Sequence, residues 1–88
     1  MEIHCAHILV KTELEAKQLL DQLKKGKKFS ELARQSLCPS GKKDGDLGSF
    51  SRGQMVREFE KAAFSLEKGQ LSDPVKTEFG WHIIKRLE

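Results

Sequence analysis

The chain lacks the features that mark several large classes of protein. Its 88 residues are too few for two domains of ordinary size, and no apolar run approaches the roughly 20 residues of a membrane-spanning helix. The first ten residues lack the charged start and apolar core of a signal peptide. We therefore expect one soluble domain over residues 1–88, located in the cytoplasm unless it is a domain of a larger exported protein.

Cysteine is scarce, and its spacing excludes one redox function. Cys5 and Cys38 are the only two cysteines, and they do not form a C-x-x-C pair, which excludes a thioredoxin-like motif. A structural disulfide between them is one alternative. A reduced chain is the simpler interpretation, because small secreted scaffolds usually carry more cysteine.

Neither sign of charge is in large excess. Sixteen basic and 13 acidic residues give a net charge of +3, and the basic residues are scattered as pairs such as Lys24-Lys25. This pattern indicates solvated faces rather than the dense basic surface of a nucleic-acid-binding arm. We expect no nucleic-acid partner and no membrane partner.

Apolar periodicity predicts short elements of both kinds. Residues 3–10 alternate as a strand that is apolar on both faces, and Thr12 and Glu15 have capping-box spacing ahead of an amphipathic helix that ends at Gly26. The remaining expected elements are a helix over residues 29–36, a strand over 46–52, a helix over 56–66, a broken strand over 71–76 and a strand over 80–87.

This order of elements indicates an α+β domain. The first and last strands are the most apolar, so we expect them to be neighbours at the centre of the sheet. Gly48 lies inside the strand over 46–52, where a glycine often marks a bulge or a close approach of the backbone.

Four motifs lie in order along nearly the whole chain. They are HILVK, CPSGKKDGDLG, FSRGQMVREFEKAAFSL and KGQLSDPVKTEFGWHIIK. Together they resemble the parvulin family of prolyl isomerases, most of all its small stand-alone microbial members, from about residue 3 to 88. The resemblance implies a parvulin-like (FKBP-like) half-barrel of four antiparallel strands, surrounded by three to four short helices, with a shallow proline-binding groove on one sheet face.

The resemblance also implies an activity. It predicts a peptidyl-prolyl cis/trans isomerase, without cofactor or metal, that acts on Xaa-Pro bonds of unfolded or flexible polypeptides and assists their folding. A monomer is the default expectation for the oligomeric state. Phosphate-directed parvulins carry a loop of clustered arginines between the first strand and first helix. Here that connection is only Lys11, Thr12 and Glu13, so we expect no dependence on phosphorylation.

Functional positions transfer from the family one at a time. The residues matching its catalytic positions are His7 in HILV, Cys38, Thr77 and His82 in GWHII. The residues matching its proline pocket are Leu47, Met55 and Phe59, with Phe50 nearby. Periodicity alone would place these apolar residues in the core. The resemblance reverses that interpretation for Met55 and Phe59 and leaves Leu47 and Phe50 shared between core and pocket.

The chemistry suits these residue types. An apolar pocket can grip the proline ring while the preceding carbonyl rotates, and a flexible methionine adapts to such a guest. We expect His7 and His82 to hydrogen-bond each other, with Thr77 ordering one of them and Cys38 facing the substrate carbonyl. A covalent route through Cys38 is an alternative, but rotation needs no nucleophile.

Two other classes of function stay open at this point. Cys5, His7, Cys38 and His82 supply enough ligands for zinc, although their spacing is not that of a zinc finger or ribbon. The chain is alternatively a non-catalytic proline-peptide-binding or chaperone module.

Overall fold

One antiparallel sheet organises the molecule. The computed structural model describes residues 2–37 and 45–88. Its four strands lie in the order β2-β1-β4-β3, with β1 (Glu2–Val10) and β4 (Gly80–Arg86) at the centre and β2 (Asp46–Ser51) and β3 (Val75–Thr77) at the edges. The predicted order of elements and the central position of the first and last strands are confirmed. The sheet is open, as in a half-barrel.

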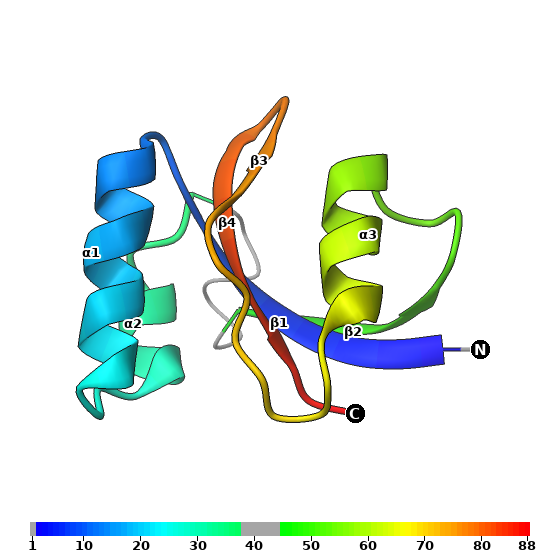
Figure 1. Cartoon of the computed structure of the whole chain (residues 1–88), viewed down its shortest axis with the longest axis horizontal. Coiled ribbons are helices and arrows are strands. Elements are labelled where there is room, and N and C mark those ends of the chain that lie inside the picture. Colours follow the sequence, from blue (N-terminus) through cyan, green and yellow to red (C-terminus); the bar gives the residue numbers. More distant parts are fainter. Residues whose placement is uncertain (1, 38–44) are drawn as a thin grey trace.

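Helices cover both faces of this sheet. Helices α1 (Glu13–Lys24) and α2 (Phe29–Ala33) lie on one side, and α3 (Arg57–Ser65) lies on the other (Figure 1). Side chains of β1 pack alternately into two cores. Ile8 and Val10 belong to the hydrophobic cluster under α1 and α2, whereas Ile3 and Cys5 belong to the cluster under α3. This division explains why the strand is apolar on both faces.

The first helix begins and ends where the sequence predicts. The Thr12 side chain accepts a hydrogen bond from the Glu15 backbone N–H at 3.2 Å, which satisfies one of the free donors of the first turn. The helix buries Ala16, Leu19 and Leu20 against the sheet. Gly26, which follows the helix, has a positive φ of 102°.

The second helix is shorter than predicted. It ends at Ala33 instead of Ser36 because the residues that follow bind the end of β1. The Leu9 N–H donates to Ser36 Oγ at 2.9 Å, and the Leu37 N–H donates to the Leu9 carbonyl at 2.8 Å. These long-range bonds draw the chain out of its helical path.

The predicted strand over residues 71–76 is also different. Only Val75–Thr77 pairs as β3, while Leu71 forms an isolated bridge with Lys85. Pro74 lies between these two contacts and has no N–H to donate, so the ladder is interrupted there.

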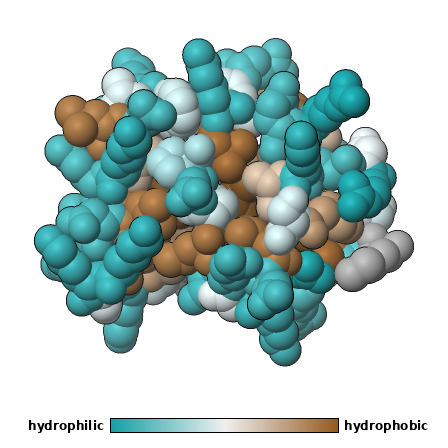
Figure 2. Space-filling model, viewed as in Figure 1, coloured by the Kyte–Doolittle hydropathy of each residue, from teal (hydrophilic) through white to brown (hydrophobic). Residues whose placement is uncertain are grey.

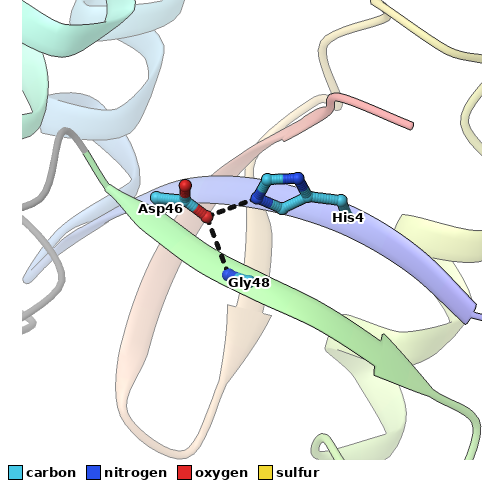
Figure 3. Close-up of polar contacts among 3 residues, drawn as sticks. All are labelled: His4, Asp46 and Gly48. Atoms are coloured by element: carbon cyan, nitrogen blue, oxygen red, sulfur yellow. Dashed lines mark hydrogen bonds and ion pairs between the residues drawn. The ribbon is translucent and has the colours of Figure 1, made fainter.

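A bulge occurs at Gly48, as the sequence predicts. His4 pairs with Ser49 and Ala6 pairs with Asp46, so two residues of β2, Leu47 and Gly48, oppose a single residue of β1. Figure 3 shows how this irregular stretch is held: Asp46 Oδ1 accepts the Gly48 N–H at 2.7 Å and lies 2.5 Å from His4 Nε2. His4, which sequence reasoning left without a role, thus fixes the start of β2.

The remaining features bear on the alternatives left open by the sequence. Cys5 is a free, fully buried thiol, so it forms no disulfide; burial raises its pKa to about 11, opposed by the charge of Arg86. Within residues 2–37 and 45–88, no helix is long and apolar enough to cross a membrane. Figure 2, in the same view as Figure 1, shows hydrophilic side chains projecting outward and hydrophobic residues gathered between them.

Two glycines allow the close approach at the start of β2 to be tested. Gly45 and Gly48 have similar φ values of 79° and 75°, but a Cβ at Gly45 would lie 2.5 Å from the His7 carbonyl oxygen, whereas none of the described atoms lies within 4 Å of one at Gly48. We expect Gly48→Ala to lower the free energy of unfolding by about 1–2 kcal/mol, the cost of the left-handed backbone. Gly45→Ala carries the same cost plus the clash, so its loss in urea unfolding should be clearly larger. Equal losses would contradict a tight contact at His7.

Candidate active site

The two predicted histidines meet on one face of the sheet. In the β1–β4 register, His7 is opposite Ile84 and His82 is opposite Leu9, so the imidazoles are diagonal neighbours. Their Nδ1 atoms are 2.9 Å apart, and the rings stack with centroids separated by 5.1 Å. Both side chains are buried. The prediction that they hydrogen-bond each other is confirmed.

Thr77 extends this pair into a chain, as expected. Its Oγ1 lies 2.7 Å from His82 Nε2 and accepts the Phe79 backbone N–H at 3.2 Å. The hydroxyl is buried with the imidazoles. A continuous series of hydrogen bonds therefore runs from the Phe79 amide through Thr77 and His82 to His7.

The far end of this series of hydrogen bonds, at His7, has no partner among the residues that the structure describes. His7 Nε2 is buried and forms no hydrogen bond with any described residue. Most buried polar atoms in folded proteins are satisfied, and exceptions often mark catalytic groups. His7 Nε2 is therefore the one polar side-chain atom of this network left without a partner among the described residues.

The partners of Thr77 allow us to infer which ring nitrogens carry the protons. No described atom other than His82 Nε2 is in place to accept the Thr77 hydroxyl proton, so the hydroxyl donates to that nitrogen. His82 must then carry its proton on Nδ1 and donate it to His7 Nδ1. The neutral His7 ring consequently holds its own proton on Nε2 and presents a hydrogen-bond donor.

Burial keeps both imidazoles neutral. It lowers the pKa of His7 to about 4, helped by the neighbouring His82, and it lowers the pKa of His82 to about 4 as well. Transfer out of water disfavours the charged form of a histidine. Both rings are therefore uncharged at neutral pH, which the proton arrangement above requires.

An aromatic side chain separates the imidazoles from the core under α3. The Phe59 ring meets His7 and His82 edge-on, with centroids 5.5 and 5.3 Å away and interplanar angles of 81° in both cases. Behind it lies Phe50, whose ring centroid is 6.0 Å from that of Phe59.

A groove of about 460 Å³ opens beside His7. The described residues that line it are His7, Leu9, Leu37, Leu47, Gln54, Met55, Val56, Phe59 and Phe79. None of these side chains carries a formal charge at neutral pH. Its volume is within the range of small-molecule sites.

Three of the four residues predicted for the pocket line this groove: Leu47, Met55 and Phe59. Phe50 does not. It is buried in the cluster under α3, behind Phe59, so any effect it has on the groove is indirect.

Met55 reaches the groove from outside the helix that carries Phe59, because α3 begins only at Arg57. The preceding turn holds Met55 in place: the Ser51 N–H donates to Gln54 Oε1 at 2.7 Å, and the Gly53 N–H donates to the Glu60 carboxylate.

Sequence reasoning missed the other lining residues. Leu37 and Phe79 are 57% and 62% exposed, high values for large apolar side chains. The signal available was the aromatic residue at the turn before Gly80, where a polar residue would be ordinary.

Cys38 lies outside the described residues, so its predicted place beside the imidazoles stays a prediction. Across the described residues, no group of three or more His, Cys, Asp or Glu is placed to hold a metal ion.

Comparison with known proteins agrees with this geometry. Residues 7–88 match the family model described as Rotamase, the PPIC-type PPIASE domain. The chain belongs to this family, the parvulin-type peptidyl-prolyl isomerases. It is 52% identical over 86 residues to foldase protein PrsA 1 of Bacillus cereus, covering 96% of this chain and 30% of that protein. The chain spans about a third of the length of the curated relatives it matches.

Two small solved parvulins are matched over nearly their full length. The structure of NmPin, the parvulin of Nitrosopumilus maritimus, gives a TM-score of 0.88 at 47% identity, covering 99% of this chain and 96% of that one. The structure of Pin from Cenarcheaum symbiosum gives a TM-score of 0.87 at 53% identity, covering 99% and 92%. The expected parvulin fold is therefore confirmed.

The neutral imidazoles of this parvulin domain predict acid sensitivity. Between pH 6.5 and about 4 a histidine of the unfolded chain is protonated, whereas folded His7 and His82 stay neutral. The unfolded state therefore binds more protons, and a fall in pH through this range favours it. We expect the free energy of unfolding contributed by this pair to be complete above pH 6.5 and to fall as the pH drops toward 4. NMR titration of the ring protons should give midpoints near 4. A midpoint near 6.5 for either ring would show that the pair is not held neutral.

Removal of the Thr77 hydroxyl should weaken the network. Thr77→Val keeps the volume of the side chain but leaves the Phe79 N–H and His82 Nε2 without their partner, at a cost of about 1–3 kcal/mol in urea unfolding. Nitrogen NMR should detect Nε2–H on His7 and Nδ1–H on His82 in the native domain, and a mixture of tautomers in the variant. Thr77→Ser, which keeps the hydroxyl, is the matched control and should preserve the native tautomers. The proton arrangement is wrong if the native domain shows the reverse pattern.

Proposed function

We propose that this parvulin domain catalyses cis/trans isomerisation of Xaa-Pro bonds in unfolded or flexible polypeptides, independently of phosphorylation, and so assists their folding. The observation that carries the proposal is the junction of a groove whose described lining is uncharged with a neutral imidazole pair, in which His7 Nε2 has no partner among the described residues.

The barrier arises from the double-bond character of the peptide C–N bond and is about 18–20 kcal/mol. Uncatalysed Xaa-Pro exchange takes roughly 10–100 s. An acceleration of about a thousand- to a million-fold requires lowering the barrier by about 4–8 kcal/mol. No covalent bond needs to form or break, so a site that grips, desolvates and polarises the amide is sufficient.

The apolar part of the groove supplies the grip. Leu47, Met55 and Phe59 converge on it from β2, the turn before α3 and α3 itself. A pyrrolidine ring held against these side chains stays fixed while the preceding carbonyl rotates. Exclusion of water from the amide favours the twisted geometry, because the planar form owes part of its stability to charge separation that water solvates.

The imidazole network supplies polarity without charge. The His7 Nε2–H donor is held by a ring whose orientation is set by His82 and Thr77, so no reorganisation is needed when a substrate arrives. It is available to a substrate amide oxygen or to the proline nitrogen, whose lone pair becomes a better acceptor as the amide twists. Cys38 remains the predicted group facing the substrate carbonyl.

The lining also supports independence from phosphorylation. A phosphorylated residue brings a charge of about −2, which binding sites match with arginine or lysine. None of the groove residues that the structure describes is a lysine or arginine. The assistance of folding is supported by the foldase relatives, while a monomeric state and a cytoplasmic location remain predictions.

Exchange NMR on an Ala-Pro peptide tests the proposal directly. The native domain should broaden and exchange the cis and trans resonances, and Met55→Ala should lower kcat/KM by about tenfold, equivalent to about 1.4 kcal/mol of lost transition-state contact. Leu14→Ala, which removes a 66% exposed side chain on α1 outside the groove, is the control and should match the native rate. Absence of exchange with the native domain would favour the alternative of a non-catalytic peptide-binding module.

A further inference from the structure

A polar contact lies on the face of the sheet opposite the groove. Side chains alternate along β1, so His4 points away from the face that carries His7. His4 Nε2 lies 2.5 Å from Asp46 Oδ1 (Figure 3), and both residues are partly buried. Neither lines the groove, and Asp46 instead lines a separate cleft together with Lys85. The contact is therefore outside the site where we place a substrate.

The same carboxylate fixes the main chain around Leu47. Asp46 Oδ1 also accepts the Gly48 N–H at 2.7 Å, which closes a turn with Leu47 at its centre. Because β2 bulges here, the register of the described strands gives Leu47 no partner on β1. The hydrogen bonds of Asp46 take the place of that pairing, and they orient Leu47, whose side chain lines the groove.

The residue before Asp46 contacts the histidine pair. The His7 N–H donates to the Gly45 carbonyl at 2.9 Å, and a Cβ at Gly45 would lie 2.5 Å from the His7 carbonyl oxygen. Gly45 is therefore fixed against the main chain of His7, while Leu47, two residues later, forms part of the groove wall. Asp46 lies between these two contacts, and His4 ties it to β1. Displacement of Asp46 would move the groove wall relative to the His7 imidazole.

We propose that His4 and Asp46 are positioning residues for the isomerisation: from the opposite face of the sheet, their contact holds Leu47 in place against the proline ring. The inference rests on the proposed function and adds two residues to those that it needs. Neither residue touches a substrate, because each acts through the main chain of β2. A wall displaced by only about 1 Å grips the ring less well, and misplacements of this size can lower rates markedly.

A double-mutant cycle tests whether His4 acts through Leu47. We expect His4→Leu and Leu47→Ala each to lower kcat/KM for an Ala-Pro peptide by about fivefold. Addition of His4→Leu to Leu47→Ala should have little further effect, because the wall that His4 positions is already gone. Two independent effects would instead multiply to about twenty-five-fold, and that result would overturn the proposal.

Rescue by a conservative substitution separates positioning from a general loss of stability. His4→Gln offers Asp46 an amide N–H in place of the imidazole Nε2, so kcat/KM should return to within about twofold of the native value. His4→Leu has a side chain of comparable size without a donor. The proposal is wrong if glutamine and leucine lower kcat/KM equally, or if the leucine variant keeps the native value.

Thr12→Ala is the matched control, because it removes another side-chain hydrogen bond outside the groove, the cap of α1. It should lower the free energy of unfolding and leave kcat/KM unchanged, at a temperature at which every variant is folded. Hydrogen exchange of the Gly48 amide reports on the contact itself: it should be faster in His4→Leu and native-like in His4→Gln. An unchanged exchange rate in His4→Leu would show that His4 does not hold the bulge.

Failure of the proposed function would give a different result. If the native domain turns over no peptide, chemical-shift titration of the Ala-Pro peptide still measures its Kd. A weaker Kd in His4→Leu, restored by His4→Gln and without further effect in the Leu47→Ala background, would then uphold the positioning role in a binding module. Equal Kd values for the native domain and His4→Leu would reject it.

Discussion

The pairing of β1 with β4 is the constraint on which the site depends. It brings together two imidazoles that are 75 residues apart in the sequence, and their diagonal placement follows from the register that sets Leu9 opposite His82. A slip of one residue would move every side chain of a strand to the opposite face. The cores on both faces oppose such a slip, because it would exchange Ile8 and Val10 with His7 and Leu9. The same hydrophobic burial that stabilises the sheet therefore aligns the histidines.

A polar network is tolerated inside this apolar core because nearly all of its polar side-chain atoms are hydrogen-bonded. Thr77, His82 and His7 hydrogen-bond one another in the interior, and within the described part of the chain only His7 Nε2 is left without a partner. Neutral rings cost less to bury than charged ones, which explains why stability and proton placement are linked. The edge-on packing of Phe59 against both imidazoles excludes water from one side of the pair.

Much of this arrangement was predictable from the sequence because it depends on local periodicity. The two-residue repeat of β1 predicts that His7 shares a face with Cys5 and Leu9, and the glycine inside β2 predicts the bulge that the register shows. The resemblance to parvulins added the pairing of His7 with His82 and Thr77. These predictions succeed because each concerns the direction of a side chain along a regular strand.

Features set by distant backbone contacts were not predictable. The end of α2 is determined by hydrogen bonds between Leu9 and the two residues Ser36 and Leu37. The position of Met55 beside the groove depends on a turn that Gln54 and Glu60 hold by hydrogen bonds. Phe79 was missed as a lining residue of the groove for a related reason. Periodicity predicts which residues are buried, so it cannot identify an apolar residue that is exposed.

The absence of formal charge in the described lining of the groove has a consequence for the conditions in which it works. Dissolved ions screen attraction between charges and also abolish long-range steering, but they leave contact between apolar surfaces largely intact. The binding that we propose for Leu47, Met55 and their neighbours therefore should not weaken through ionic screening, and salts excluded from the protein surface should strengthen it. Cooling has the larger effect, because apolar association weakens as the temperature falls.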